Sequence, residues 1–208
     1  FASLLAVNDL HRPDGQPVVF ALHIEAEILG CEILWQDSTP PSVVSHPLAS
    51  GADLSSLQVP AKEDGRLPMV LVVMRRMSST FGRDTALYGL VTGPFTLASH
   101  LRGTEVFMDM MLDPDKVTEL MTFCEAVCVR MSELYIEAGM DVIAVVDPMV
   151  SQIGPDHFEQ FCRQPLSRIF SRVRELGAYS AAFVCGNATR NIEGLCSTNP
   201  DCLSIDEN

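Results

Sequence analysis

From residue 85 onward, short apolar stretches alternate along the chain with longer amphipathic ones. The short stretches, at residues 85–91, 141–146, 180–184 and 202–205, have the length and composition of strands, and several are apolar throughout. Strands that are apolar on both faces are typical of parallel sheets covered by helices. The alternation therefore predicts an α/β fold with a parallel sheet, and both a doubly wound sheet and a (β/α)8 barrel satisfy it.

The clearest helix signal in the sequence begins at Asp113. Asp113 is a favourable N-cap, Pro114 suits the first helical position, and Gly139 stands where the helix would end. The apolar residues between them recur at spacings of three and four, as one face of a helix requires: Val117, Leu120, Met121, Cys124, Val127, Cys128, Met131, Leu134, Tyr135 and Ala138. We expect one long helix that places Cys124 and Cys128 in the core.

The pattern before residue 85 is less regular. Residues 17–23 have the composition of a strand, residues 24–29 of one or two helical turns, and residues 68–77 of a helix. Two further short strands, at residues 31–35 and 43–48, flank a loop with two prolines. The chain begins without Met and ends on an apparent strand, so we expect it to be a piece of a longer protein.

Composition and motifs exclude several classes of function. The chain carries 27 acidic against 14 basic residues, and its formal net charge of −13 repels the phosphate backbone of nucleic acid. No apolar run reaches the roughly 18 residues of a membrane span, and no P-loop or dinucleotide-binding motif is present. Seven cysteines without a scaffold-like spacing indicate a reduced, cytoplasmic setting.

The stretch at residues 179–189 places a thiol where α/β proteins bind ligands. A short strand runs into Cys185, Gly186 permits a sharp exit, and Asn187 and Thr189 are both good helix N-caps. Ligand sites in this fold class lie at the carboxyl ends of the strands. Cys185 is therefore a metal ligand, a nucleophile or a small core residue.

Polar side chains follow four of the expected strands: His23 with Glu25, Asp147, Cys185, and Asp206 with Glu207. In a closed parallel barrel these groups would face one mouth. Carboxylates and a thiolate suit a divalent metal such as zinc, and they also suit acid–base chemistry. Each has a structural alternative, because Asp147 can bond turn amides and Asp206 with Glu207 can simply be solvated.

Five stretches together resemble the uroporphyrinogen decarboxylase superfamily. They lie at residues 89–99, 138–147, 155–161, 184–189 and 203–207, and their order and spacing carry the resemblance. The resemblance extends over nearly the whole chain from about Pro17. It implies a (β/α)8 TIM barrel, of which residues 1–208 would form a single partial domain that lacks segments at both ends.

The superfamily has two main branches. One decarboxylates uroporphyrinogen around an aspartate early in the barrel, whereas the other transfers methyl groups to or from corrinoid proteins. Ala21 stands where the decarboxylases carry that aspartate, and residues 22–30, 35–44 and 185–187 resemble the methylcobalamin:coenzyme M methyltransferases. The resemblance implies methyl transfer between a small substrate and a corrinoid protein. A uroporphyrinogen decarboxylase and a non-catalytic barrel homologue are the alternatives.

The resemblance also implies roles for individual residues. The methyltransferases use zinc, held by a His-x-Cys pair and a later cysteine, to lower the pKa of a thiol substrate. Cys185 matches the first cysteine, Phe183 stands at the histidine position, and Asp206 and Glu207 are candidate further ligands. We therefore expect Cys185 as a metal ligand or substrate-contacting thiol, and Asp206 or Glu207 as a ligand or base.

The remaining expectations concern substrate and partners. Asp147 is expected to position the substrate, and the residues expected to bind it are His23, Glu25, Gly93 and Asn187. The cobalamin is expected on a separate corrinoid protein, because the chain contains no visible cobalamin-binding module. The small-molecule partner is a methyl donor or acceptor, and a homodimer is an alternative to a monomer.

Overall fold

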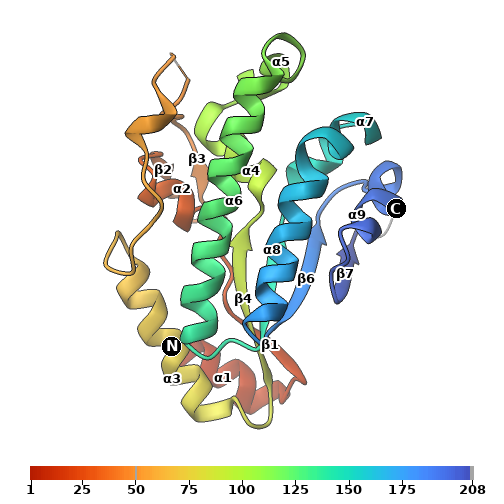
Figure 1. Cartoon of the computed structure of the whole chain (residues 1–208). Helices are drawn as coiled ribbons and strands as arrows, with labels where there is room; N and C mark the ends of the chain where they lie inside the picture. The colour runs from red at the N-terminus through yellow and green to blue at the C-terminus, as the bar shows by residue number, and fades with distance from the viewer. Residues whose placement is uncertain (50, 207–208) are drawn as a thin grey trace.

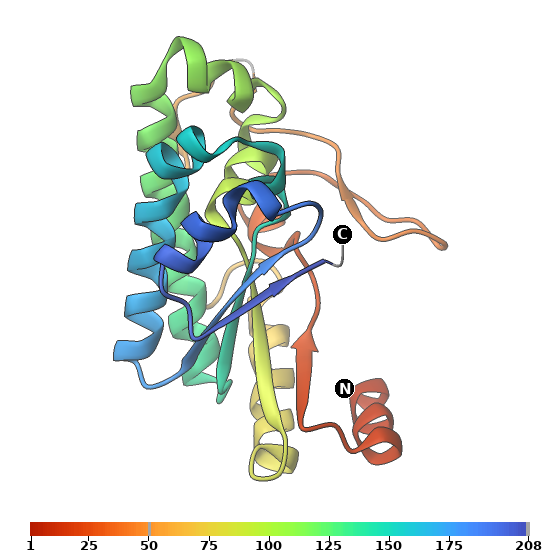
Figure 2. The ribbon, with the colours of Figure 1, turned by 90° about the vertical axis from the view of Figure 1, so that its right-hand side faces the viewer.

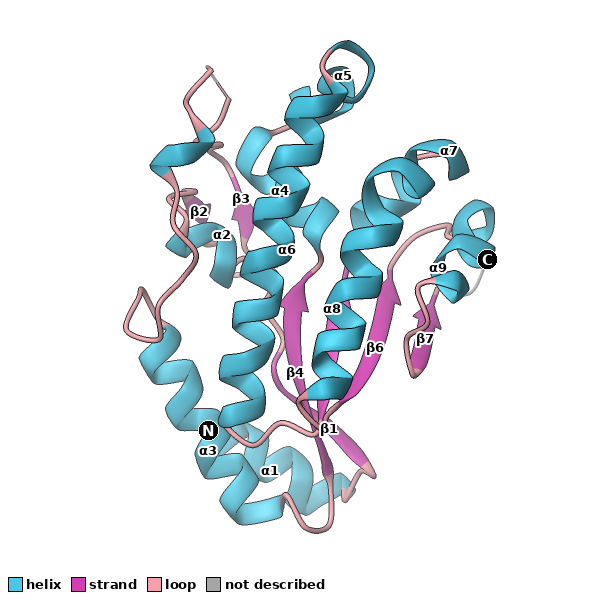
Figure 3. Cartoon of the chain, viewed as in Figure 1, coloured by secondary structure: helices cyan, strands magenta, loops and turns pink. Residues whose placement is uncertain are grey.

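The computed structural model describes residues 1–49 and 51–206, which fold around a parallel five-stranded sheet. Its strands are β1 (Gly15–Val19), β4 (Ala86–Thr92), β5 (Val142–Val146), β6 (Tyr179–Val184) and β7 (Cys202–Ile205). Every neighbouring pair is parallel, so their carboxyl ends lie at one edge (Figure 3).

The strands lie in the sheet in the order in which they occur in the chain, β1-β4-β5-β6-β7. Right-handed crossovers that all move in one direction place their helices on one face of the sheet. Accordingly α6 (Pro114–Glu137) and α8 (Arg163–Glu175) lie on the same side of it (Figures 1 and 2). A doubly wound sheet reverses its strand order, so this arrangement belongs to the barrel type.

The α6 helix forms as its sequence predicts. The Asp113 side chain accepts a hydrogen bond from the Lys116 backbone N–H at 3.4 Å, and Cys124 and Cys128 are fully buried, which confirms the prediction for both thiols. Gly89 on β4 lets the helix approach the sheet, since a Cβ there would lie 2.9 Å from Cδ2 of Tyr135. Within the described residues, no helix is both long and apolar enough to cross a membrane.

The two faces of the sheet differ. One packs against the helices and forms the main core, whereas the other carries a smaller apolar cluster of Leu90, Val142, Ala144, Val146 and Ala181. Side chains alternate along each strand, so in β5 the even-numbered residues face this inner side and the odd-numbered ones face the helices. In a barrel the inner side is the interior.

The first half of the chain differs most from expectation. The strand predicted at residues 17–23 is β1 and ends at Val19, and α2 (Ile24–Ile28) follows. The two predicted short strands form an antiparallel pair outside the main sheet, β2 (Ile33–Leu34) and β3 (Ser42–Val43). The segment after them contains a 3-10 turn, η1 (Leu54–Ser56), and α3 (Leu67–Phe81).

Helix α1 (Ala2–His11) lies near the amino ends of the strands (Figure 1). Its buried Asn8 donates to Oε1 of Gln16 at 2.9 Å and to Oγ1 of Thr85 at 3.2 Å. Gln16 in turn donates to the Leu4 carbonyl at 3.0 Å. These bonds fix the helix to β1 and to the residue that precedes β4.

The connections on the helical side complete the fold. Between β4 and α6 lie α4 (Pro94–Arg102) and α5 (Glu105–Leu112), the second of which the sequence did not reveal. After β5 come η2 (Pro148–Gln152), α7 (Pro155–His157), a π-helical turn (Phe158–Cys162) and α8. Pro165 lies inside α8, which continues through it without a break. Since Pro165 has no N–H to donate, the turn before it widens while the chain stays helical.

Candidate active site at the strand ends

Cys185 and Asp206 follow neighbouring strands at the carboxyl edge of the sheet. Cys202 pairs with Ala181 and Ser204 with Phe183, so these inward-facing positions run side by side up the two strands. Side chains alternate between the two faces of a strand, so Cys185 and Asp206, two residues further along, also face the inner side. Both residues are exposed. The Gly186 backbone N–H donates to Oδ2 of Asp206 at 2.6 Å, which fixes the carboxylate beside the thiol.

The surroundings of Cys185 keep its sulfur protonated. Partial burial raises the pKa of the Cys185 thiol, and the nearby negative charge of Asp206 raises it further. A thiolate at neutral pH needs the opposite environment, a cation or a base beside the sulfur. The exposure of Cys185 excludes the interpretation of it as a core residue.

The turn after β6 differs in detail from the prediction. Gly186 has a φ of +89°, and a Cβ there would lie 2.9 Å from Oγ of Ser151. Asn187 is exposed, and its Oδ1 accepts a hydrogen bond from the Thr189 backbone N–H at 3.0 Å, which makes a local turn. A 3-10 turn, η4 (Thr189–Asn191), intervenes before α9 (Ile192–Ser197), so neither Asn187 nor Thr189 is the N-cap of that helix.

Asp147 lies on the opposite side of the sheet from Cys185. It is buried, and its carboxylate accepts hydrogen bonds from the Phe95 N–H at 3.0 Å, the Thr96 N–H at 2.8 Å and the Thr96 hydroxyl at 2.6 Å. Burial raises the pKa of Asp147 to about 6, although these hydrogen bonds oppose the rise. The alternation explains the placement, because Val146 faces inward and Asp147 therefore faces α4. Of the groups expected to face one mouth of the barrel, Cys185 and Asp206 therefore lie together, and Asp147 does not join them.

Gly93 is required by the packing of Asp147. A Cβ on Gly93 would lie 2.3 Å from Cβ of Asp147, far inside any normal contact. The Gly93 N–H also donates to the Val146 carbonyl at 2.8 Å, so the end of β4 and the start of α4 lie directly against β5. This contact explains why a glycine precedes Pro94, and no substrate is needed to account for it.

Glu25 does not line the mouth, because its side chain is fully buried. It accepts hydrogen bonds from the Thr92 N–H at 3.0 Å and from the Thr92 hydroxyl at 2.7 Å. Burial raises the pKa of Glu25, against the effect of these bonds. The Cys128 thiol donates to the Thr92 carbonyl at 3.0 Å, so Glu25 and Cys128 together fix the carboxyl end of β4.

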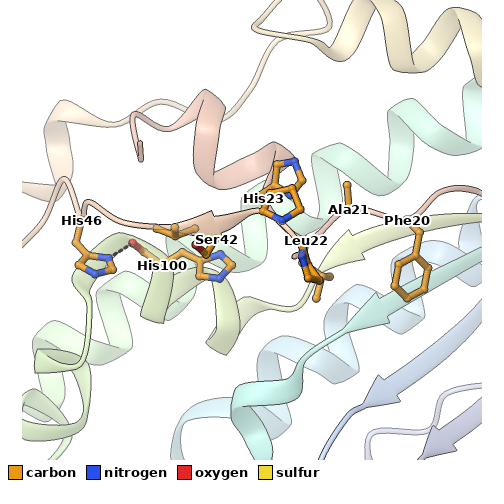
Figure 4. Close-up of a pocket in the computed structure, with 10 residues that line it drawn as sticks. Phe20, Ala21, Leu22, His23, Ser42, His46 and His100 are labelled. Carbon is orange, nitrogen blue, oxygen red and sulfur yellow. Dashed lines mark hydrogen bonds between the residues drawn. The ribbon is translucent and has the colours of Figure 1, made fainter. Parts of the chain in front are cut away.

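His23 immediately precedes α2 and reaches the surface of the mouth. Its ring makes an edge contact with Trp35, with 4.9 Å between the ring centroids, and Arg66 covers the same indole at 4.7 Å. Burial and the charge of Arg66 lower the pKa of His23, whereas Glu27 raises it. His23 lines a hollow with His46 and His100 (Figure 4), two residues that no sequence motif connects to it.

A second hollow, of about 350 Å³, lies on the inner side of the sheet, and all the residues that line it are uncharged. They are Gly15, Pro17, Phe20, Tyr88, Leu90, Ala144, Val146 and Phe183. Phe183 thus presents an aromatic ring to the interior at the position where the resemblance places a histidine. Phe20 lines this hollow as well as the histidine-lined one.

The zinc expected from the resemblance does not fit the described residues. Within residues 1–49 and 51–206, no three His, Cys, Asp or Glu side chains are placed to hold a metal ion. Cys185 and Asp206 supply two donors, Phe183 cannot ligate, and Glu207 lies outside the described residues. Structural and catalytic zinc sites in proteins use at least three protein ligands.

Comparisons with known proteins agree with this architecture. The chain is 28% identical over 193 residues to the methylcobamide:CoM methyltransferase of Methanosarcina acetivorans, covering 91% of this chain and 57% of that protein. It is 29% identical over 171 residues to the uroporphyrinogen decarboxylase of Anaeromyxobacter dehalogenans, covering 78% and 48%. A solved methyltransferase from Methanosarcina mazei superposes with a TM-score of 0.88 at 27% identity, over 96% of this chain and 60% of that one.

The chain therefore spans only 48% to 60% of the length of these relatives. The (β/α) barrel architecture predicted from the sequence is confirmed by the strand order and by this structural likeness. The family profile described as "Uroporphyrinogen decarboxylase (URO-D)" matches residues 2–208. Since that match covers nearly the whole sequence, the chain belongs to the uroporphyrinogen decarboxylase family.

Proposed function

We propose that this chain is part of a methyltransferase that moves a methyl group between a small thiol substrate and a corrinoid carried by a separate protein. The methylcobamide:CoM methyltransferase relative matches a larger share of the chain than the decarboxylase relative, 91% against 78%. The corrinoid protein, the cytoplasmic location and the homodimer remain predictions, as do substrate contacts by His23, Gly93 and Asn187.

One structural observation carries the proposal: a thiol and a carboxylate stand together above an interior hollow without charged residues. Uroporphyrinogen is a polycarboxylate, and burying it requires cations. Two arginines of α8 instead pair with glutamates of α6, Arg168 with Glu125 at 2.6 Å and Arg172 with Glu133 at 2.9 Å. Ala21 supplies no carboxylate at the position where the decarboxylases carry their aspartate.

The chemistry assigned to the two residues follows from their positions. In the transfer, the sulfur of the acceptor bonds to the methyl carbon, the carbon–cobalt bond breaks, and its electron pair stays on cobalt. The proton of the acceptor thiol must leave, and Asp206 takes it. Cys185 contacts the acceptor sulfur and orients it. No step in this proposal passes through zinc.

The test is methyl transfer from methylcobalamin to coenzyme M by the intact protein. Cys185→Ala and Asp206→Asn are each expected to reduce the rate on the order of a hundredfold, because positioned groups that contact reacting atoms contribute about that much. Cys196→Ala is the matched control, since Cys196 is also exposed but lies on α9. Metal content of wild type and Cys185→Ala, measured in parallel, reports on zinc without depending on activity.

Two outcomes would contradict the proposal. Metal-independent decarboxylation of uroporphyrinogen that persists in Cys185→Ala would assign the chain to the other branch of the family. Absence of both activities in a folded, intact protein supplied with cobalamin and thiols would favour a non-catalytic homologue.

A further inference from the structure

Residues 185–191 connect β6 to α9, and Cys185 is the first of them (Figure 3). Cys185, Gly186 and Asn187 are wholly or partly exposed, whereas Ala188 and Asn191 are buried. The Asn191 backbone N–H donates to the Ala188 carbonyl at 2.9 Å, which joins the two buried residues. The connection therefore has an exposed beginning that carries the thiol and a buried end that anchors it.

The anchor is the side-chain amide of Asn191. Its Nδ2 donates to the carbonyls of Val150 and Ile153, both at 2.9 Å. These carbonyls belong to the segment that follows β5, since Val150 lies in η2 and Ile153 comes directly after it. Oδ1 of Asn191 is buried and has no hydrogen-bond partner among the described residues. A flipped amide would place Oδ1 against two carbonyls, so the orientation of the amide is set.

The η2 segment is also held from the side of α4. The Thr96 hydroxyl donates to Asp147 at 2.6 Å and accepts a hydrogen bond from the Met149 backbone N–H at 3.2 Å. Within η2, the Ser151 hydroxyl donates to the Pro148 carbonyl at 2.7 Å. The segment after β5 is thus a fixed surface for the connection that follows β6.

This surface meets the Cys185 turn at Gly186. A Cβ on Gly186 would lie 2.9 Å from Oγ of Ser151, so the backbone of the turn packs directly on that side chain. From the end of the next strand, Asp206 accepts the Gly186 N–H at 2.6 Å. The residue after the thiol is therefore in contact with both η2 and the end of β7, and Asn191 keeps the connection and η2 together.

We propose that Asn191 is a positioning residue for Cys185, because it ties the connection after β6 to η2 and so fixes where the sulfur stands beside Asp206. Both of its donors are directed at η2 carbonyls, so it acts through the backbone of the turn. The inference rests on the proposed function for its part in methyl transfer. The position of the sulfur can be measured without that reaction.

Release of the turn changes the reactivity of the Cys185 thiol. In the present position, partial burial and then the negative charge of Asp206 raise the pKa of Cys185. A turn that is freed from η2 exposes the sulfur and lets it move away from the carboxylate. Both effects then weaken, and the fraction of thiolate at a given pH increases.

Alkylation of the intact protein with iodoacetamide, followed by mass spectrometry of its peptides, measures this reactivity. Asn191→Ala is expected to raise the alkylation rate of Cys185 at pH 7 several-fold and to move the midpoint of its pH profile downward. Cys196 is also exposed, so its rate in the same sample is an internal reference. The buried Cys124 reports global unfolding, because it is labelled only when the core opens.

Thr198→Ala is the matched control. Thr198 is buried at the end of α9, and its hydroxyl donates to the Leu195 carbonyl at 2.6 Å, a local bond that does not involve η2. This variant is expected to leave the alkylation of Cys185 unchanged. Ser151→Ala removes the atom that packs on Gly186 while Asn191 stays in place, and it is expected to raise the Cys185 rate even where Asn191→Ala fails to fold.

The outcomes separate this inference from the proposed function. Wild-type alkylation of Cys185 in Asn191→Ala, or in Ser151→Ala where the first variant does not fold, would overturn it, as would an equal rise at Cys185, Cys196 and Cys124. In the methyl-transfer assay, Asn191→Ala is expected to lower kcat several-fold with KM unchanged, since a misplaced group reacts less often once substrate is bound. If the wild type transfers no methyl group, the proposed function fails, and the alkylation rates still decide the role of Asn191.

Discussion

At the scale of single residues, Asp147 makes the clearest prediction. Burial raises its pKa from 3.8 to about 6, so between these pH values the folded chain holds a proton that the unfolded chain has lost. Its contribution to the free energy of unfolding is therefore complete below about pH 4 and is lost as pH rises through about 6. The gap in pKa corresponds to about 3 kcal/mol.

Denaturant unfolding of wild type and Asp147→Asn across pH 4 to 7 checks this sign. The stability of wild type relative to the variant is expected to fall as pH rises, because the asparagine does not titrate. Asp201→Asn gives a flat control in this range, since hydrogen bonds from Ser180 lower the pKa of Asp201 below 3.8 and its contribution changes only below about pH 4. A flat difference for Asp147 would mean that the three donors on its carboxylate outweigh its burial.

The residues of the site could be predicted only in part. The sequence indicated correctly that Cys185 and Asp206 follow neighbouring strands, because strand ends can be read from apolar runs. It did not separate Asp147 from them, although the alternation along β5 places Val146 and Asp147 on opposite faces. His46 and His100 could not have been found, because chain segments 54 residues apart bring them together.

At the scale of elements, α4 and α7 begin with the same Gly-Pro sequence but in different surroundings. A Cβ on Gly93 would lie 2.3 Å from Asp147, whereas a Cβ on Gly154 would have no atom within 4 Å. Both glycines have extended backbone with negative φ, so alanine is conformationally acceptable at either position. The difference between them is therefore purely one of packing.

Gly93→Ala is expected to destabilise the protein by at least 1–3 kcal/mol, roughly the cost of overpacking, because the Asp147 backbone would have to move. Gly154→Ala is expected to stay within about 0.5 kcal/mol of wild type, as unstrained surface substitutions do. Unfolding midpoints of the two variants measure the difference. Equal midpoints would show that β5 and α4 separate more easily than their hydrogen bonds suggest.

The elements themselves were largely predictable where local signals were strong. The boundaries of β7 and the N-cap of α6 follow from apolar runs and capping residues that act within one or two turns. The π-helical turn before Pro165 was not predictable from the proline alone, since the residue permits a break, a kink or a wider turn. Packing of Phe158 and Phe161 into the core keeps this segment helical.

At the scale of the whole molecule, the order of the strands carries the functional argument. A repeated strand–helix pattern is shared by barrels and doubly wound sheets, because each crossover satisfies the same local rules whichever way the next strand is added. The structure adds every strand on the same side, so within residues 1–49 and 51–206 one face of the sheet is left without covering helices. That face carries the apolar hollow and the inward-facing Cys185 and Asp206.

The same order predicts a gradient of protection across the sheet of residues 1–208. β5 lies in the centre, pairs on both sides and is buried throughout, whereas β7 pairs with β6 alone among the described strands and is half exposed. Hydrogen exchange measured on this polypeptide is expected to be on the order of a hundredfold slower for β5 amides than for β7, because central strands open only in global unfolding. Equal protection would mean that further pairing covers β7, which would place the mouth beside Asp206 inside a closed sheet.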